Sequence, residues 1–463
     1  MSFEPRSLPV DAAARAALAA QGLEYRLIDP GDTAAVDAWV DADQRGFHHA
    51  RPRPEAREFE RRVLGERRAH GVYDSTIPEP AVPVATVSSW PAGLSVPGGR
   101  SVDGWAVSSV TVAPTHRRRG IARAMMEAEL ATASKAGAAV AMLTVTEATI
   151  YGRYGYAPAA KAATIQVDRR RARWSGPDAP GRVHFVEPAG LADLAPALWR
   201  RAVARTPGEI DRWPAIRDRV LGLAEPDSDS SRSLRAIRYD DERGKPQGFA
   251  TFRVTREPHQ PGWVEFDVLA AATDDAERAL WRALIEQDFV SGTRGLLRSV
   301  DEPLEWLLED PRAVTVSDVT DHLWIRIVDA IAALGARRYG AAGELVLDIE
   351  DPLGHAAGRF TLLVSADGRA VVHAADGAAE SAPRRERSRS RSTSAEQVGS
   401  RARTAEPRSL KLDVRDLGSI YLGGVRPSVL ARAGRITASN AGALDLADRM
   451  FAATRAPHLS IWF

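Results

Sequence analysis

The segment of residues 107–156 constrains the fold more than any other part of this chain. It begins with the apolar, Ser/Thr-rich run VSSVTV, continues through APTHRRRGIA into an Ala-, Met- and Leu-rich stretch, and then reads AVAMLTV and IYGRYGY. We expect a strand, a basic glycine turn, a helix over 121–137, a strand over 138–146 and an aromatic turn. Pro114 ends the first strand, because proline donates no hydrogen bond to a ladder. This order predicts a β-α-β unit.

The basic turn of this unit carries Arg117, Arg118, Arg119 and Gly120, where the helix begins. A helix start offers unpaired N–H groups and the positive end of a dipole, and glycine allows a ligand to approach the backbone. An arginine triplet alone would be a solvated surface patch, but its place between strand and helix favours a polyphosphate ligand. The patterns of a Walker loop and of a dinucleotide fingerprint are both missing here.

Composition narrows the class of protein. The 463 residues predict two to four domains at roughly 150 residues each. A net charge of +1 gives no overall field for nucleic acid or an anionic membrane. The chain has no cysteine, which excludes disulfides, thiolate zinc sites and a cysteine nucleophile. No apolar run approaches the ~20 residues that span a bilayer, and no signal peptide is evident. We expect a cytoplasmic protein with no membrane partner; unconventional export stays open.

Residues 45–54 form an irregular stretch with two adjacent histidines and two prolines. Adjacent histidines rarely point to one ion and no third ligand is near, so no metal site is predicted. The stretch is either a plain surface loop or a loop over a pocket, with Phe47 as a substrate-binding wall. A charged helix is expected over 55–70, a strand over 81–90 and a turn region over 91–103.

The later part of the chain repeats the strand–helix order over 263–270 and 276–289, without a basic turn between them. The connecting AATDDA is acidic and would repel phosphates, which predicts a second copy of the unit with no cofactor site. The insertion at 376–407 is rich in Arg and Ser and nearly free of apolar residues, so we expect disorder. A solvated loop is one interpretation of the insertion, and RNA binding is the other.

The sequence VTVAPTHRRRGIA resembles the acetyl-CoA signature of the GCN5-related N-acetyltransferases (GNAT), with Arg117, Gly120 and Ala122 at its core positions. Together with IYGRYGYAPA it resembles, more closely, the enhanced intracellular survival (Eis) acetyltransferases. That resemblance implies an α/β (α+β) fold with tandem GNAT-like units and a sterol-carrier-protein-like α/β domain. It also implies homohexamers that acetylate amines of aminoglycosides. The domains are expected at 1–22 (an N-terminal extension), 23–178 (acetyl-CoA-binding GNAT), 179–325 (degenerate GNAT-like) and 326–463 (sterol-carrier-like, with the insertion).

The resemblance also implies site residues. It implies Tyr151 as general acid and the terminal carboxylate of Phe463 as general base. Carried over by motif, the acetyl-CoA contacts are Val110, Thr111, Val112, Arg118, Arg119, Gly120, Ile121, Ala122, Arg123, Thr146 and Glu147. Trp462 stands where the family commonly has an acidic residue, and we expect it to contact substrate. Alternatively, Trp462 and Phe463 complete the core of the last domain.

The resemblance implies an enzyme that transfers acetyl from acetyl-CoA to primary amines, at several positions of aminoglycosides or related polyamines, without a metal. A tyrosine with a pKa near ~10 suits protonation of a thiolate whose own pKa is ~8.5. The alternatives are a protein or peptide lysine acetyltransferase, and a non-catalytic protein that binds lipid or RNA.

Overall fold

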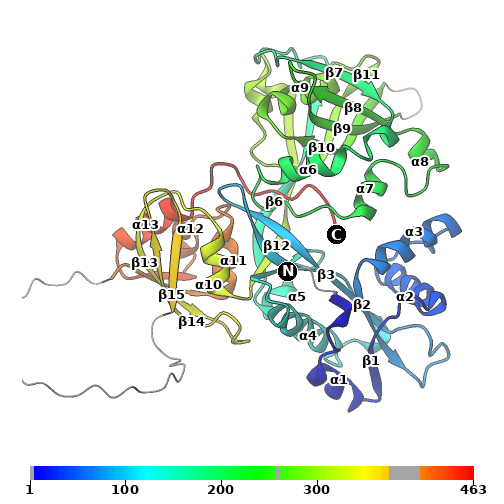
Figure 1. The fold of residues 1–463 in the computed structure, drawn as a ribbon, viewed down its shortest axis with the longest axis vertical. Coiled ribbons are helices and arrows are strands. Elements are labelled where there is room, and N and C mark those ends of the chain that lie inside the picture. Colours follow the sequence, from blue (N-terminus) through cyan, green and yellow to red (C-terminus); the bar gives the residue numbers. More distant parts are fainter. Residues whose placement is uncertain (1–4, 257–260, 375–406) are drawn as a thin grey trace, which may run out of the picture.

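The computed structural model describes residues 5–256, 261–374 and 407–463 (Figure 1). Apart from Pro407, the Arg/Ser-rich insertion lies outside these residues. The described strands form a 12-stranded sheet, in the order β1-β2-β3-β4-β5-β12-β6-β11-β10-β9-β8-β7, and a 5-stranded sheet, in the order β15-β14-β13-β16-β17. No helix in the described ranges is both long enough and apolar enough to cross a membrane.

The first copy of the α/β unit surrounds the basic turn. Its elements are α1 (Ala12–Ala19), β1 (Leu23–Leu27), α2 (Thr33–Gly46), α3 (Pro54–Gly65), β2 (Arg68–Asp74), β3 (Ala85–Val96), β4 (Arg100–Val112), α4 (Ile121–Lys135), β5 (Val140–Thr144), α5 (Ala148–Tyr151) and β6 (Ala157–Asp168). Helix α4 packs its buried methionines and Leu130 on the core that also holds Trp105 of β4. This packing fixes the start of α4 beside the end of β4.

Two expectations for this copy were wrong. The helix expected over 55–70 stops at Gly65, and β2 follows it in the interior. Its Arg68 is fully buried and donates hydrogen bonds to the carbonyl oxygens of Leu8 and Pro9, at 2.5 and 2.9 Å. The turn region expected over 91–103 belongs mostly to a long β3–β4 hairpin, which turns only between Val96 and Arg100.

The second copy continues the same sheet. Its elements are β7 (Arg182–Val186), α6 (Ala195–Val203), α7 (Pro214–Val220), α8 (Asp229–Arg232), β8 (Arg235–Asp240), β9 (Pro246–Thr255), β10 (Gly262–Ala271), α9 (Asp274–Ile285), β11 (Val290–Arg298) and β12 (Val314–Ile327). Strand β12 lies between β5 and β6, and β6 pairs in turn with β11. The two copies therefore share strands, and the domain limits inferred from sequence stay predictions.

The third region folds around the smaller sheet. Its elements are α10 (Ala330–Ala336), β13 (Gly343–Glu350), β14 (Gly358–Val364), β15 (Ala370–Ala374), β16 (Ser409–Asp413), α11 (Val414–Tyr421), α12 (Pro427–Arg432), β17 (Ile436–Ala438) and α13 (Ala441–Phe451). A buried ion pair of 2.7 Å joins Arg326 of β12 to Asp351, and Arg326 also donates to the carbonyl oxygen of Tyr154. After α13, residues 452–463, which we call the C-terminal tail, cross to the space between the two copies (Figure 1).

Candidate active site

Strands β4 and β5 diverge in the middle of the first copy. Their parallel pairing runs from Gly104 to Ala106 on β4, and beyond it β4 continues to Val112 along β3. The register with β3 shifts near Ser109, whose φ is 58°, so the strand bulges at this point. Along the diverging edge lie the predicted contacts Val110, Thr111 and Val112, all half-buried. An edge of this kind suits an extended ligand with amide groups, such as the pantetheine arm of CoA.

The start of α4 offers a site for the phosphates. Gly120 is its N-cap with φ 74°, no side chain caps the helix, and its first turn holds no acidic residue. A Cβ at Gly120 would meet nothing within 4 Å, so the backbone angle rather than crowding requires glycine here. The first amides of α4 are thus available to an anion at the positive end of the helix dipole.

The other contacts predicted at this turn differ in accessibility. Arg118 and Arg123 are exposed. Arg119 donates a hydrogen bond of 3.1 Å to the carbonyl oxygen of Gln21, so its guanidinium group is directed toward the N-terminal segment. Ile121 is buried in the core, so only its backbone can face a ligand, and Ala122 is half-buried. The residues present fit CoA. The arginines of the basic turn and the first N–H groups of α4 can bind its phosphates, and the diverging edge of β4, which leads into this turn, can bind its pantetheine arm.

Tyr151 lies in α5, shortly after the end of β5. Burial raises the pKa of Tyr151, with a hydrogen bond from the Thr146 side chain acting in the opposite direction. The phenol therefore keeps its proton at neutral pH, as a general acid must. Thr146 and Glu147 are exposed in the short connection between β5 and α5.

The end of the chain reaches the end of β5. The Thr144 hydroxyl donates a hydrogen bond of 2.7 Å to a terminal carboxylate oxygen of Phe463. The Phe463 ring packs edge-on against Trp90 of β3, with ring centroids 5.5 Å apart. The structure thus brings the last residue to the strand end that leads into Tyr151, although more than 300 positions separate the two in sequence.

Trp462 and Phe47 have different surroundings. Trp462 is 51% exposed, packs edge-on against His322 at 4.4 Å, and lines a cavity of about 610 Å³ against the second copy. Phe47 is half-buried just after α2, and its ring stacks on His49 at 6.1 Å. A Cβ on Gly46 would lie 2.5 Å from the Thr111 side chain, so this end of α2 closely approaches β4.

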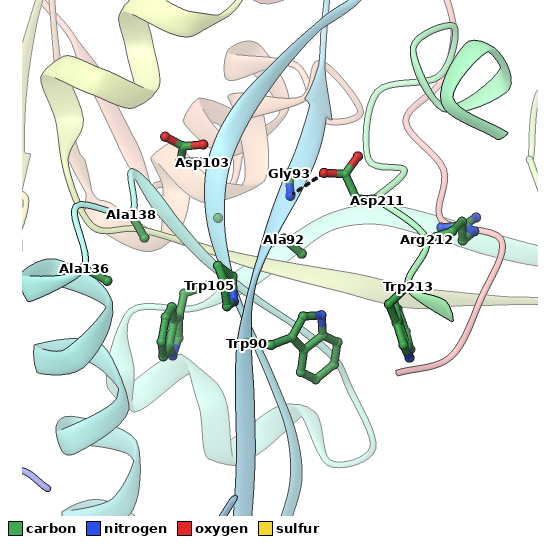
Figure 2. Close-up of a pocket in the computed structure, with 12 residues that line it drawn as sticks. Trp90, Ala92, Gly93, Asp103, Trp105, Ala136, Ala138, Asp211, Arg212 and Trp213 are labelled. Atoms are coloured by element: carbon green, nitrogen blue, oxygen red, sulfur yellow. Dashed lines mark hydrogen bonds between the residues drawn. The ribbon is translucent and has the colours of Figure 1, made fainter. Parts of the chain in front are cut away.

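Sequence reasoning missed an aromatic wall beside Phe463. The rings of Trp90 and Trp213 lie 5.2 Å apart, and the Arg67 guanidinium lies 4.0 Å from the Trp90 ring centroid. Trp90 and Trp213 line a cavity of about 200 Å³. Figure 2 shows both rings at this cavity, together with the hydrogen bond from the backbone N–H of Gly93 to the Asp211 carboxylate. Because Trp213 belongs to the second copy, no local signal could have paired it with Trp90.

A second missed residue is Asp43, in the last turns of α2. Burial raises the pKa of Asp43 to about 7, opposed by a hydrogen bond with Ser109 at the β4 bulge. Its Oδ1 atom is buried without a hydrogen-bond partner. A carboxyl group that titrates near neutral pH therefore lies directly behind the diverging edge of β4.

Comparisons with known proteins identify the family and the domains of this chain. An acetyltransferase (GNAT) domain matches residues 27–159 and another matches 208–327, and a sterol carrier protein domain matches 330–460. An N-acetyltransferase of Streptomyces avermitilis is 32% identical over 450 residues, which are 94% of this chain and 97% of that relative. The N-acetyltransferase Eis of Mycobacterium tuberculosis is 34% identical over 368 residues, or 78% of this chain and 80% of Eis. The chain belongs to the Eis family of GNAT N-acetyltransferases.

A solved Eis structure has the same overall fold. The crystal structure of Eis1 from Mycobacterium abscessus superposes with a TM-score of 0.75 at 28% identity, and covers 95% of this chain and 100% of that one. The predicted family, the tandem GNAT fold with a sterol-carrier-like domain, and acetyltransferase activity are thereby confirmed. The GNAT fold implies acetyl-CoA as the donor. The individual site residues stay predictions.

Proposed function

We propose that this Eis-family enzyme acetylates several amines of aminoglycosides or related polyamines, with Tyr151 as general acid and the Phe463 carboxylate as general base. The supporting observation is the bond between Thr144 and the Phe463 carboxylate at the end of β5. This hydrogen bond holds the Phe463 carboxylate, a group that can accept a proton, at the point where β4 and β5 have diverged.

Each group has one role in the proposed reaction. The Phe463 carboxylate accepts the proton that the acceptor amine loses as its nitrogen bonds to the thioester carbon. An N–H group on the 110–112 edge of β4 donates to the thioester oxygen, where negative charge develops. Tyr151 donates its proton to the CoA sulfur as the carbon–sulfur bond breaks.

The acceptor would occupy the space beside the tail. The 610 Å³ cavity lined by Trp462 also carries the carboxyl groups of Asp267 and Asp318, together with Arg219 and Arg253. Such a cavity could accommodate the distal part of a multi-ring amine while one amine meets Phe463. Carboxyl groups attract protonated amines, and the two arginines would limit how many such amines bind at once.

The proposed function can be tested by measuring the release of CoA thiol with three acceptors at equal concentration: kanamycin, spermidine and a lysine peptide. We expect kanamycin to be turned over fastest, with products carrying more than one acetyl group by mass spectrometry. Fastest turnover of the lysine peptide would favour the protein-acetylating alternative, and release no faster than thioester hydrolysis with all three would contradict the proposal.

We also propose the homohexamer that the family resemblance implies. Sedimentation equilibrium on the full chain tests it, and a mass of one protomer at micromolar concentration would contradict it.

A further inference from the structure

The second copy repeats the geometry of the cofactor cleft but changes its chemistry. Strands β10 and β11 are parallel and pair as far as Phe266 and Gly295, after which they diverge, as β4 and β5 do in the first copy. Helix α9 follows β10 just as α4 follows β4. The second copy therefore has an equivalent cleft between diverging strands, with a helix start at its edge.

The start of α9 cannot hold phosphates as the start of α4 can. The Thr273 side chain caps α9, and its first turn carries Asp274, Asp275 and Glu277. These carboxylates occupy the positive end of the helix dipole, where the first copy has a bare glycine. An anionic cofactor would be repelled here, so the cleft is available for something else.

The C-terminal tail runs along this cleft and lines it. Arg455 forms ion pairs with Asp274 and with Glu277, the latter at 3.3 Å. Next along the tail, the buried His458 donates from Nε2 to the carbonyl oxygen of Leu297 on β11, at 2.6 Å. The Arg455 guanidinium thus lies at the start of α9, the position that corresponds to the proposed phosphate site of the first copy. His458 hydrogen-bonds to β11, one of the two diverging strands.

Further contacts hold the tail from the other side. The backbone N–H of His458 donates to the carbonyl oxygen of Pro207 at 2.8 Å. Ser460 donates its N–H to Glu209 at 3.2 Å and accepts a bond from Arg212 at 2.8 Å. These contacts continue along the tail as far as Ser460, three residues before the carboxylate that bonds to Thr144.

We propose that the cleft of the second copy is a docking site for the C-terminal tail, and that Arg455, paired with Asp274 and Glu277, is a positioning residue for the Phe463 carboxylate. This rests on the proposed role of that carboxylate. The ion pairs of Arg455 hold the tail where it enters the cleft. The hydrogen bonds of His458 and Ser460 hold the residues that follow, up to three positions before Phe463. A catalytic group displaced by about 1 Å can cost about 100-fold in rate, so a loosened anchor reduces turnover without touching the donor site.

The test compares full-length Arg455→Ala and Arg455→Lys with the wild type. Arg205 pairs with the same two carboxylates, so neither becomes isolated in Arg455→Ala and the fold should persist; thermal unfolding checks this. Arg432→Ala, at an exposed position on α12, is the control for loss of one positive charge. Two measurements are made on each variant: kcat and KM for acetyl-CoA, and the rate at which carboxypeptidase A releases phenylalanine from the chain end.

For Arg455→Ala we expect kcat to fall about tenfold, an unchanged KM for acetyl-CoA, and faster release of phenylalanine. Arg455→Lys should have a kcat and a rate of phenylalanine release close to those of the wild type, and Arg432→Ala should match the wild type in both. Wild-type resistance to carboxypeptidase in Arg455→Ala would overturn the docking role. Fast release with wild-type kcat would overturn the positioning role. A chain lacking Phe463 that turns over normally would instead contradict the proposed base, and it would do so whatever the carboxypeptidase result.

Discussion

The hydroxyl of Thr144 and the terminal carboxylate of Phe463 form a hydrogen bond of 2.7 Å that joins the end of β5 to the end of the chain. Thr144 is buried, and its strand pairs with β12, the strand that the second copy contributes to the first. The bond therefore holds the carboxylate at the end of a central strand of the shared sheet. The Phe463 ring also packs against the hydrophobic core, so the role of the carboxylate is a matter for the kinetic tests below.

Replacing Thr144 by Val keeps the shape of the side chain and removes the donor. A hydrogen bond to a charged group contributes roughly 1.5–3 kcal/mol, so we expect kcat to fall by about 10-fold or more. The KM for acetyl-CoA should stay constant. Steady-state kinetics measure both, and Thr144→Ser, which keeps the hydroxyl, is the matched control. If Thr144→Val and Thr144→Ser have equal kcat, the bond does not position the base.

Tyr151→Phe tests the proposed acid. Loss of a general acid costs about 100-fold or more, so kcat should fall by that factor while acetyl-CoA still binds. The raised pKa of Tyr151 keeps the phenol protonated through neutral pH, so its titration should cause no loss of activity below pH ~10. Tyr154→Phe is the control within the same turn. Equal turnover of the Tyr151 and Tyr154 variants would reject the assignment.

Trp462→Ala tests the proposed substrate contact. Its half-exposed ring lines the 610 Å³ cavity, and we expect its loss to raise the KM for the amine by about 10-fold, in line with roughly 1–2 kcal/mol for an aromatic contact. The kcat should change little. Trp306→Ala removes a tryptophan that is 79% exposed elsewhere, and it should leave both constants unchanged. A raised KM in both variants, or in neither, would argue against a role for Trp462.

Asp43→Asn should make the protein more stable at high pH. The pKa of Asp43 is raised from 3.8 to about 7 in the folded protein, so the folded state binds the extra proton between these values. Ionisation of Asp43 therefore destabilises the fold progressively from pH 4 to 7, and fully above pH 7. The gain from Asn is at most about 4 kcal/mol at pH 8 and should vanish near pH 4. Urea unfolding at both pH values measures it, and an equal effect at both would contradict the assignment.

The parts of this site that lie within one short segment could be predicted from the sequence, whereas contacts between distant segments could not. Pro114, Gly120 and a run of strong helix formers lie within one short segment, so the turn and its helix were predictable. Strand β2 was not, because buried Arg68 reads as a surface residue until distant carbonyl groups satisfy it. The Trp90–Trp213 contact depends on the pairing of residues 209–211 of the second copy with β3, which is remote in sequence. The path of the tail along the second cleft likewise depends on two helix starts that differ in charge and in their caps.

The last prediction concerns the pH at which the tail loosens. His322 bonds through Nε2 to the carbonyl oxygen of Ile461 at 2.8 Å, and burial lowers its pKa to about 4. His458 also faces it and disfavours its charge, while Glu209 and Asp321 act in the opposite direction. Because the folded pKa lies below the unfolded value of 6.5, His322 stabilises the fold above pH 6.5, and this contribution is lost as pH falls toward 4.

His322→Gln keeps an amide donor for Ile461 and does not titrate. Between pH 7.5 and pH 4.5 the wild type should therefore lose more stability than the variant, by at most about 3 kcal/mol. The lowered pKa of His458 contributes in the same direction to both proteins, so it cancels in the difference. Urea unfolding at the two pH values gives this difference, and carboxypeptidase release of phenylalanine at pH 5.5 should be faster for the wild type than for the variant. Equal losses of stability in both proteins would show that His322 does not carry the acid sensitivity of the tail.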